Sequence, residues 1–271
     1  ISLLKIILEE MKIPKNQISP KEIKNSISYY KNKLITPSEA LKKASLVIDK
    51  TYAAIYKTYQ LELLKNNAVD FDDLLLLPLE IFKKNSEVLT KYQDIWKYIL
   101  VDEYQDTNKP QFMLVKLLSG EKQQVCVVGD DDQSIYGWRG ADIRNILDFK
   151  KVFDKCDVFK LEKNYRSTGN ILDAAISVVR NNDNRAPKEL KSNEGPGHKL
   201  GLIETNDELE EADAVVNALE KEIKLDKRNF SDFAILYRTN SQSRALEDSF
   251  MKSGIPYNIV GGVRFYERKE I

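Results

Sequence analysis

The sequence predicts an α/β protein with parallel sheets and helices, together with a segment that is entirely helical. Two observations lead to this prediction. Capping boxes and an apolar stripe with helical spacing occupy the first third of the chain. Short apolar runs then alternate with helical stretches, which is typical of parallel β–α–β units. At 271 residues, the chain is long enough to form two domains with separate cores.

The first third contains two helix starts, Ser19–Glu22 and Thr36–Glu39, each with a capping residue, proline at the first helical position and glutamate three residues after the cap. After the second start, apolar residues recur at steps of three or four and predict one long helix. Core packing accounts fully for this stripe, which comprises Leu41, Ala44, Ile48, Tyr52, Ile55, Tyr59 and Leu63.

A strand–helix–strand unit follows, with apolar runs at Trp96–Val101 and Val125–Val128 on either side of a helical stretch, Pro110–Leu118. Both strands of such a unit point the same way. We therefore expect Asp102–Glu103 and Asp130–Gln133 to leave the sheet at one edge, where open α/β sheets bind ligands.

A second alternating series occupies the rest of the chain. Helices are expected after Thr168, from Asp207 to about Lys224, and up to about Gly254. The polar segment Asn181–Gly197, which contains two prolines, is interpreted as a long surface loop. Strands are expected at Val158–Leu161, Leu200–Ile203, Phe233–Tyr237 and Tyr257–Val260.

The composition excludes several classes of protein. Because 42 basic residues balance 42 acidic ones, net charge neither supports nor excludes contact with nucleic acid, which would need a local surface. Cys126 and Cys156 are too few for a disulfide framework or a zinc site, which suits a reducing cytoplasm. No apolar run approaches the roughly 20 residues of a membrane span, so we expect a cytoplasmic protein without a membrane segment.

Asp102 and Glu103 place two adjacent carboxylates at the end of a strand. One can hold a magnesium ion, and the other can orient or deprotonate an attacking water. A polar turn after a strand is the alternative interpretation.

The segment Gly129–Ala141 carries the richest chemistry. Its acids do not fit a calcium loop, because isoleucine and alanine stand where that loop needs glycine and a bidentate glutamate. Gln133 can sense a phosphate, while Tyr136, Trp138 and Arg139 can stack on bases and hold a nucleic-acid backbone. The alternative is that the two aromatic residues belong to the core.

Asn164–Ser167 also leaves the end of a predicted strand. There Tyr165 can stack on a nucleotide base, and Arg166 can reach a terminal phosphate. A surface tyrosine and an ion-paired arginine are the alternative.

Taken in order, these segments resemble the motifs of superfamily 1 DNA helicases of the UvrD/PcrA/Rep type. Asp102–Asn108 resembles their Walker B motif, Gly129–Ala141 their third motif and Leu161–Ser167 their fourth. Three further segments also match in order: Asp70–Leu74, Leu236–Asn240 and Gly261–Ile271.

The resemblance implies RecA-like P-loop NTPase sheets with helices and an all-helical inserted subdomain. The inserted subdomain would be residues 1–66, followed by part of the first RecA-like domain at 67–160 and part of the second at 161–271. The implied activity is ATP-dependent movement on single-stranded DNA, with 3′-to-5′ unwinding at duplex junctions.

The resemblance also assigns roles to single residues, with ATP and Mg²⁺ as cofactors. Asp102 would coordinate Mg²⁺, and Glu103 would activate water. Gln133 would contact the γ-phosphate of ATP, and Tyr165 would stack on its adenine. Arg166 would act as an arginine finger. The single-stranded DNA path would include Tyr136, Trp138 and Arg139.

This sequence departs from the family in two respects. Gly137 occupies a position that varies in the family, and no Gly-x-x-x-x-Gly-Lys-Ser/Thr phosphate loop occurs in the 271 residues. Because position 1 is not methionine and the last residues lie inside a family motif, we expect a fragment. Because the phosphate loop and its lysine are missing, we expect that this fragment alone does not hydrolyse ATP. Two alternatives are a non-catalytic DNA- or partner-binding module with relic motifs and the helicase part of a helicase–nuclease.

Overall fold

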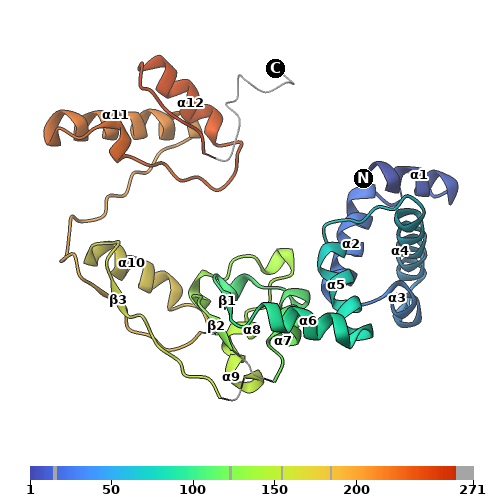
Figure 1. Ribbon diagram of the computed structural model, residues 1–271. Coiled ribbons are helices and arrows are strands. Elements are labelled where there is room, and N and C mark those ends of the chain that lie inside the picture. The colour runs from blue at the N-terminus through green and yellow to red at the C-terminus, as the bar shows by residue number, and fades with distance from the viewer. Residues whose placement is uncertain (15–16, 122–123, 154, 184, 261–271) are drawn as a thin grey trace. The chain divides into compact units, whose positions relative to one another are not determined.

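The computed structural model describes residues 1–14, 17–121, 124–153, 155–183 and 185–260 (Figure 1). The chain forms two compact units, Ile1–Gly195 and Pro196–Ile271. The predicted motif segment Gly261–Ile271 lies outside the described residues.

The first unit begins with a helical bundle, as the sequence predicts. Ser19 and Thr36 accept hydrogen bonds from the backbone N–H groups of Glu22 and Glu39, so both capping boxes are confirmed. Apolar side chains of the bundle form one buried cluster around Ile7, Ile23 and Ile55. Its helices are α1 (Ser2–Glu10), α2 (Pro20–Asn32), α3 (Pro37–Lys43) and α4 (Val47–Lys65).

The prediction of one long helix after Thr36 is wrong. Helix α3 ends at Lys43, Ala44 adopts an extended conformation (φ −68°, ψ 116°), and α4 starts at Val47. Asp49 accepts the backbone N–H of Leu46 at 3.3 Å, which helps to start the second helix. The break lets α3 pack against α4, and it leaves Leu41 and Ile48 of the predicted stripe exposed.

The predicted strand–helix–strand unit is confirmed. Strand β1 (Ile99–Val101) pairs in parallel with β2 (Val125–Val127), in a register that places Val101 beside Val127. Helix α7 (Lys109–Ser119) connects them and is capped by Asn108. Helices α5 (Asp73–Lys84) and α6 (Ser86–Ile95) both pack against α7.

Between β2 and the second unit, the strands are only two residues long. The predicted strand Val158–Leu161 is not formed, and Phe159 and Leu161 are exposed. Instead β3 (Lys163–Asn164) pairs in parallel with β4 (Lys191–Ser192), inside the segment predicted to be a surface loop. The helical elements here are η2 (Asp131–Gln133), η3 (Gly137–Arg139), α8 (Arg144–Leu147), α9 (Phe149–Val152) and α10 (Gly169–Val179), whereas η1 (Tyr104–Asp106) precedes α7.

The second unit contains α11 (Glu208–Asp226), a short turn η4 (Phe230–Asp232) and α12 (Ser243–Lys252), and α11 packs against α12. The three strands predicted in this unit are not formed among its described residues. Phe233 and Ile235 still pack against the helices, while Leu236 is 94% exposed. The period-two pattern therefore set which side chains are buried, but a strand also needs a hydrogen-bonded neighbour.

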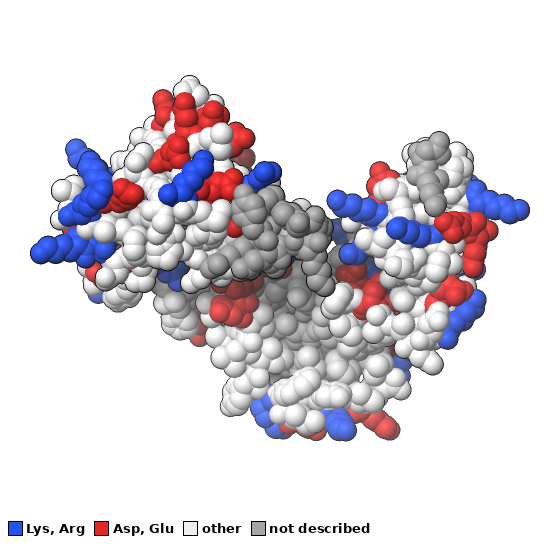
Figure 2. Space-filling model, turned by 90° about the horizontal axis from the view of Figure 1, so that it is seen from above, with Lys and Arg blue, Asp and Glu red and all other residues white. Residues whose placement is uncertain are grey.

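The fold class is thus mixed α/β with small parallel sheets. On the face shown in Figure 2, both acidic and basic side chains are exposed. None of the described helices is both long and apolar enough to cross a membrane.

Candidate functional site

The candidate site begins where β1 ends. Glu103 adopts a left-handed backbone conformation (φ 49°, ψ 43°), which turns the chain sharply after Asp102. That conformation costs a residue other than glycine about 1–2 kcal/mol, and such strain gathers at functional sites. The turn leaves the side chains of Asp102 and Glu103 exposed, whereas Tyr104 and Gln105 are buried.

Gln105 connects this turn to the loop that follows β2. Its side-chain amide donates to Oε2 of Glu103 at 2.8 Å, and its Oε1 accepts the backbone N–H of Asp130 at 3.0 Å. The backbone N–H of Tyr104 also donates to the carbonyl of Val128 at 2.9 Å. The two strand ends therefore meet at one edge, as predicted.

Gly129 makes this close approach possible. A Cβ atom at position 129 would lie 2.5 Å from Oε1 of Gln105 and 3.1 Å from the backbone nitrogen of Tyr104. Any larger residue would separate the two loops. The hydrogen bond from Asp130 to Gln105 depends on this glycine.

Gln133 belongs to the same network. Its side-chain amide donates to Oδ2 of Asp130 at 2.8 Å, and its backbone N–H donates to the carbonyl of Asp130 at 2.9 Å. A continuous chain of hydrogen bonds therefore runs from Glu103 through Gln105 and Asp130 to Gln133. The structure thus links two predicted site residues, Glu103 and Gln133. The connecting residues, Gln105 and Asp130, had no predicted role.

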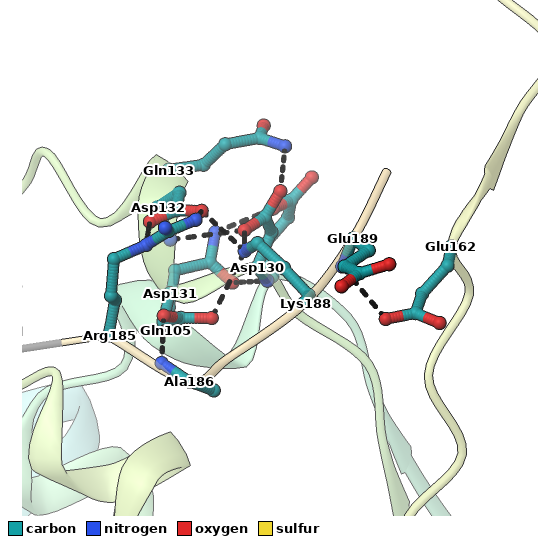
Figure 3. A network of polar contacts seen from close by, with 11 residues as sticks. Gln105, Asp130, Asp131, Asp132, Gln133, Glu162, Arg185, Ala186, Lys188 and Glu189 are labelled. Atoms are coloured by element: carbon teal, nitrogen blue, oxygen red, sulfur yellow. Dashed lines mark hydrogen bonds and ion pairs between the residues drawn. The ribbon is translucent and has the colours of Figure 1, made fainter. Parts of the chain in front are cut away.

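Basic residues of the Asn181–Gly197 segment complete the network (Figure 3). Lys188 contacts the carboxylates of Asp130, Asp131 and Asp132, and Arg185 binds Asp132 through two nitrogen atoms at 3.0 and 2.7 Å. Neither Lys188 nor Arg185 was predicted from the sequence. The only local signal is two basic residues flanking Pro187, and nothing nearby in sequence indicates their acidic partners.

These contacts perturb the pKa values of the carboxyl groups. Burial raises the pKa of Asp130, but the hydrogen bonds from Lys188 and Gln133 outweigh it and leave that pKa below its usual value. The pKa of Asp132 is lowered chiefly by its hydrogen bonds to Arg185. For Lys188, burial opposes protonation, but the hydrogen bond to Asp130 leads the contributions that raise its pKa. The charged forms of Asp130, Asp132 and Lys188 are therefore favoured in the folded protein.

The predicted DNA-contacting residues form a separate exposed group. Trp138 is 73% exposed and Tyr136 is 37% exposed, so the interpretation of both as core residues is wrong. The guanidinium of Arg139 lies 4.8 Å from the ring centre of Tyr136 and 4.6 Å from that of Trp138. Gly140, with φ 94°, ends the turn in a conformation that favours glycine.

Tyr165 and Arg166 follow β3 and are both exposed. Oδ1 of Asn164 accepts the backbone N–H groups of Arg166 and Ser167, which shapes the turn. Within the described ranges, no carboxylate pairs with the guanidinium of Arg166, and no bond or ring contact joins Tyr165 or Arg166 to Glu103 or Gln133. The structure does not bring these two residues to the network.

Asp102 is the carboxylate at the strand end that the resemblance assigns to Mg²⁺. Asp102 uses Oδ1 to accept the backbone N–H of Glu103 at 2.9 Å. Mg²⁺ commonly takes one or two carboxylates together with substrate phosphates and water. The described part of the chain holds no cluster of three or more metal-binding side chains, so phosphate and water oxygens would supply the other ligands.

Comparison with known proteins identifies the family. Residues 1–154 match the UvrD/REP helicase N-terminal domain, and residues 159–271 match the UvrD-like helicase C-terminal domain. The chain is 47% identical over 270 residues to the ATP-dependent DNA helicase PcrA of Staphylococcus epidermidis strain RP62A. It is equally similar to the PcrA helicases of Staphylococcus aureus strains Mu50 and NCTC 8325.

Each of these matches covers 100% of this chain and 37% of the relative. The chain therefore spans little more than a third of the length of these helicases. Both domain matches and the identity along the chain agree with the family resemblance inferred from the sequence. This chain belongs to the UvrD/REP helicase family.

Proposed function

We propose that this chain carries part of the machinery of an ATP-dependent helicase that moves 3′-to-5′ along single-stranded DNA and unwinds duplex junctions. The observation that carries the proposal is the hydrogen-bond chain that links Glu103 with Gln133 at the carboxyl edge of two parallel strands. The relatives are named ATP-dependent DNA helicases. A RecA-like fold, with residues 1–66 as an inserted helical subdomain, and a cytoplasmic location belong to the same proposal.

Glu103 would act as the general base for the water that attacks the γ-phosphate of ATP. Gln105 engages one carboxylate oxygen, so the other is left to accept the proton of that water. Asp102 would hold Mg²⁺, which neutralises charge on the phosphates. The products are ADP and phosphate.

Gln133 would contact the γ-phosphate. A side-chain amide has two N–H donors and a carbonyl acceptor. Asp130 uses one N–H group, which leaves the second for a phosphate oxygen and the carbonyl for the attacking water. The exposed position of Gln133 supports this role.

The remaining residues would contact DNA and the far side of the nucleotide. Base stacking on exposed aromatic side chains is worth about 1–3 kcal/mol per base, and Trp138 is 73% exposed. Arg139 would add positive charge along the strand. Tyr165 would stack on adenine, and Arg166 would reach the phosphates as an arginine finger.

The phosphate-binding loop is absent from the 271 residues, so we propose that the isolated chain does not hydrolyse ATP. The proposed helicase function is tested with the full-length protein that contains these 271 residues. We expect single-stranded DNA to stimulate ATP hydrolysis, and we expect unwinding of duplexes with a 3′ tail but not of those with a 5′ tail.

A protein that binds DNA without hydrolysing ATP would instead be a non-catalytic binding module. Cleavage of the DNA during unwinding would indicate a helicase–nuclease. The Glu103→Gln variant serves as the matched control, because contaminating ATPases or nucleases would be unaffected by it.

A further inference from the structure

Three adjacent carboxylates precede Gln133. We call Asp130, Asp131 and Asp132 the acid triplet. Their side chains are 30%, 8% and 7% exposed, respectively. Like charges that are this close and this poorly hydrated disfavour ionisation and need cations nearby.

The cations come from the segment Arg185–Lys188, which we call the basic segment. Lys188, 14% exposed, contacts all three carboxylates, with Nζ 3.2 Å from Oδ1 of Asp131 and 2.8 Å from Oδ2 of Asp132. Arg185 holds Asp132 at two points, and the backbone N–H of Ala186 donates to Asp131 at 2.7 Å. Figure 3 shows the basic segment crossing the acid triplet with Lys188 among the carboxylates.

Asp130 is the junction between the basic segment and Gln133. Its Oδ1 accepts a hydrogen bond from the ammonium group of Lys188 and another from the backbone N–H of Asp132, the latter at 3.0 Å. Its Oδ2 receives the side-chain amide of Gln133 at 2.8 Å. Lys188 therefore binds one oxygen of the Asp130 carboxylate, and the other oxygen accepts the hydrogen bond from Gln133.

The two sides of this contact come from different parts of the chain. The acid triplet lies within residues 1–154, which match the N-terminal helicase domain. The basic segment lies within residues 159–271, which match the C-terminal domain. A shift of the basic segment would thus be transmitted to Gln133 through one carboxylate.

We propose that Lys188 is a positioning residue for Gln133, because it holds the Asp130 carboxylate that orients the Gln133 amide toward the nucleotide. The proposal rests on the role proposed above for Gln133. Lys188 itself need not touch ATP. Removing it should therefore slow turnover more than it weakens ATP binding.

The test uses ATP hydrolysis by the full-length protein with saturating single-stranded DNA. Lys188→Met should lower kcat by about 10–100-fold, by analogy with the loss caused by removing a residue that orients a metal ligand, while the KM for ATP changes less than about twofold. Lys188→Arg should recover most of the activity. Lys191→Met is the matched control, because Lys191 lies nearby with its side chain 79% exposed.

A double-mutant cycle separates positioning from a general loss of structure. In a Gln133→Ala background, Lys188→Met should cause little further loss of kcat, because the group that it orients is already gone. Equal losses in both backgrounds, or no loss in the wild-type background, would overturn the proposal. If Lys188→Met does not fold, Asp130→Asn provides the same cycle.

Backbone amide exchange in the 271-residue chain gives a second readout that needs no activity. The N–H of Asp132 donates to Asp130, so Lys188→Met should speed its exchange, while Lys191→Met should not. Unchanged exchange would contradict the positioning of Asp130 by Lys188. Absence of ATP hydrolysis in the wild-type protein would instead contradict the proposed function.

Discussion

The ammonium group of Lys31 in α2 lies 2.8 Å from a carboxylate oxygen of Asp73 at the start of α5, and the side chains are 0% and 5% exposed. Asp70 approaches the same ammonium group at 2.7 Å. Burial raises the pKa of Asp70, but the hydrogen bond from Lys31 leads the contributions that leave it below its usual value. These ion pairs connect α2 of the helical bundle with the start of α5, which packs against α7.

Lys31→Met should therefore destabilise the first unit strongly. Removing one partner of a buried ion pair leaves an uncompensated charge and costs about 3–5 kcal/mol. Urea unfolding followed by circular dichroism measures the loss. The control is Lys24→Met, at an exposed position of the same helix, which should change stability by less than about 0.5 kcal/mol. A similar small effect for both variants would show that the cluster adds no net stability.

Glu103→Gln and Asp102→Asn in the full-length protein should have different effects. Glutamine keeps the size of glutamate but cannot act as a base, so turnover should fall by about 10²–10⁴-fold while ATP and DNA still bind. Asp102→Asn should weaken the Mg²⁺-dependent part of nucleotide binding. Nucleotide titrations and phosphate release measure the two effects, and the reverse pattern would mean that the two roles are exchanged.

Trp138→Ala should weaken binding of single-stranded DNA by about 1–3 kcal/mol, the usual contribution of one base–aromatic stack. Because Trp138 is 73% exposed, the melting temperature should hardly change. Fluorescence anisotropy with labelled DNA measures the affinity. Trp96→Ala is the control, since Trp96 packs against Tyr92 at 4.9 Å and should affect stability rather than DNA. Unchanged affinity for Trp138→Ala would exclude it from the DNA path.

Arg166→Ala should lower ATP turnover by about 10³-fold or more, which is typical of an arginine finger. Its guanidinium has no carboxylate partner in the described ranges of the chain, so folding should be preserved. Steady-state ATP hydrolysis by the full-length protein measures the effect against Arg180→Ala, at an exposed position of the same region. A loss of tenfold or less would be too small for a finger.

The stabilisation from Asp132 should depend on pH. Because Arg185 lowers its pKa in the folded protein below the usual 3.8, the stabilisation is present above that value and is lost as the pH falls through the folded pKa. Asp132→Asn should destabilise by about 1.5–3 kcal/mol at pH 7, and the gap from wild type should shrink below about pH 4. Urea unfolding at several pH values tests this, with exposed Asp157→Asn as control. A gap that stays constant down to pH 3 would contradict it.

The sequence by itself determined the features that follow from local residue patterns and from the direction of the chain in a crossover unit. The capping boxes at Ser19 and Thr36, the parallel pairing of β1 and β2, and the meeting of Glu103 and Gln133 at one edge could all be predicted. Caps need residues three positions apart, and a crossover unit has only one direction for its strand ends. The ordered motifs were enough to identify the family.

Only the tertiary structure decided the features that join distant parts of the chain. Lys188 meets Asp130 across 58 residues, and Lys31 meets Asp73 across 42. No local pattern links such partners, because an ion pair depends on where the fold places two charges. The strand predicted at Phe233–Tyr237 fails for a related reason. Alternation chooses the buried face, but a strand forms only where another backbone supplies hydrogen bonds.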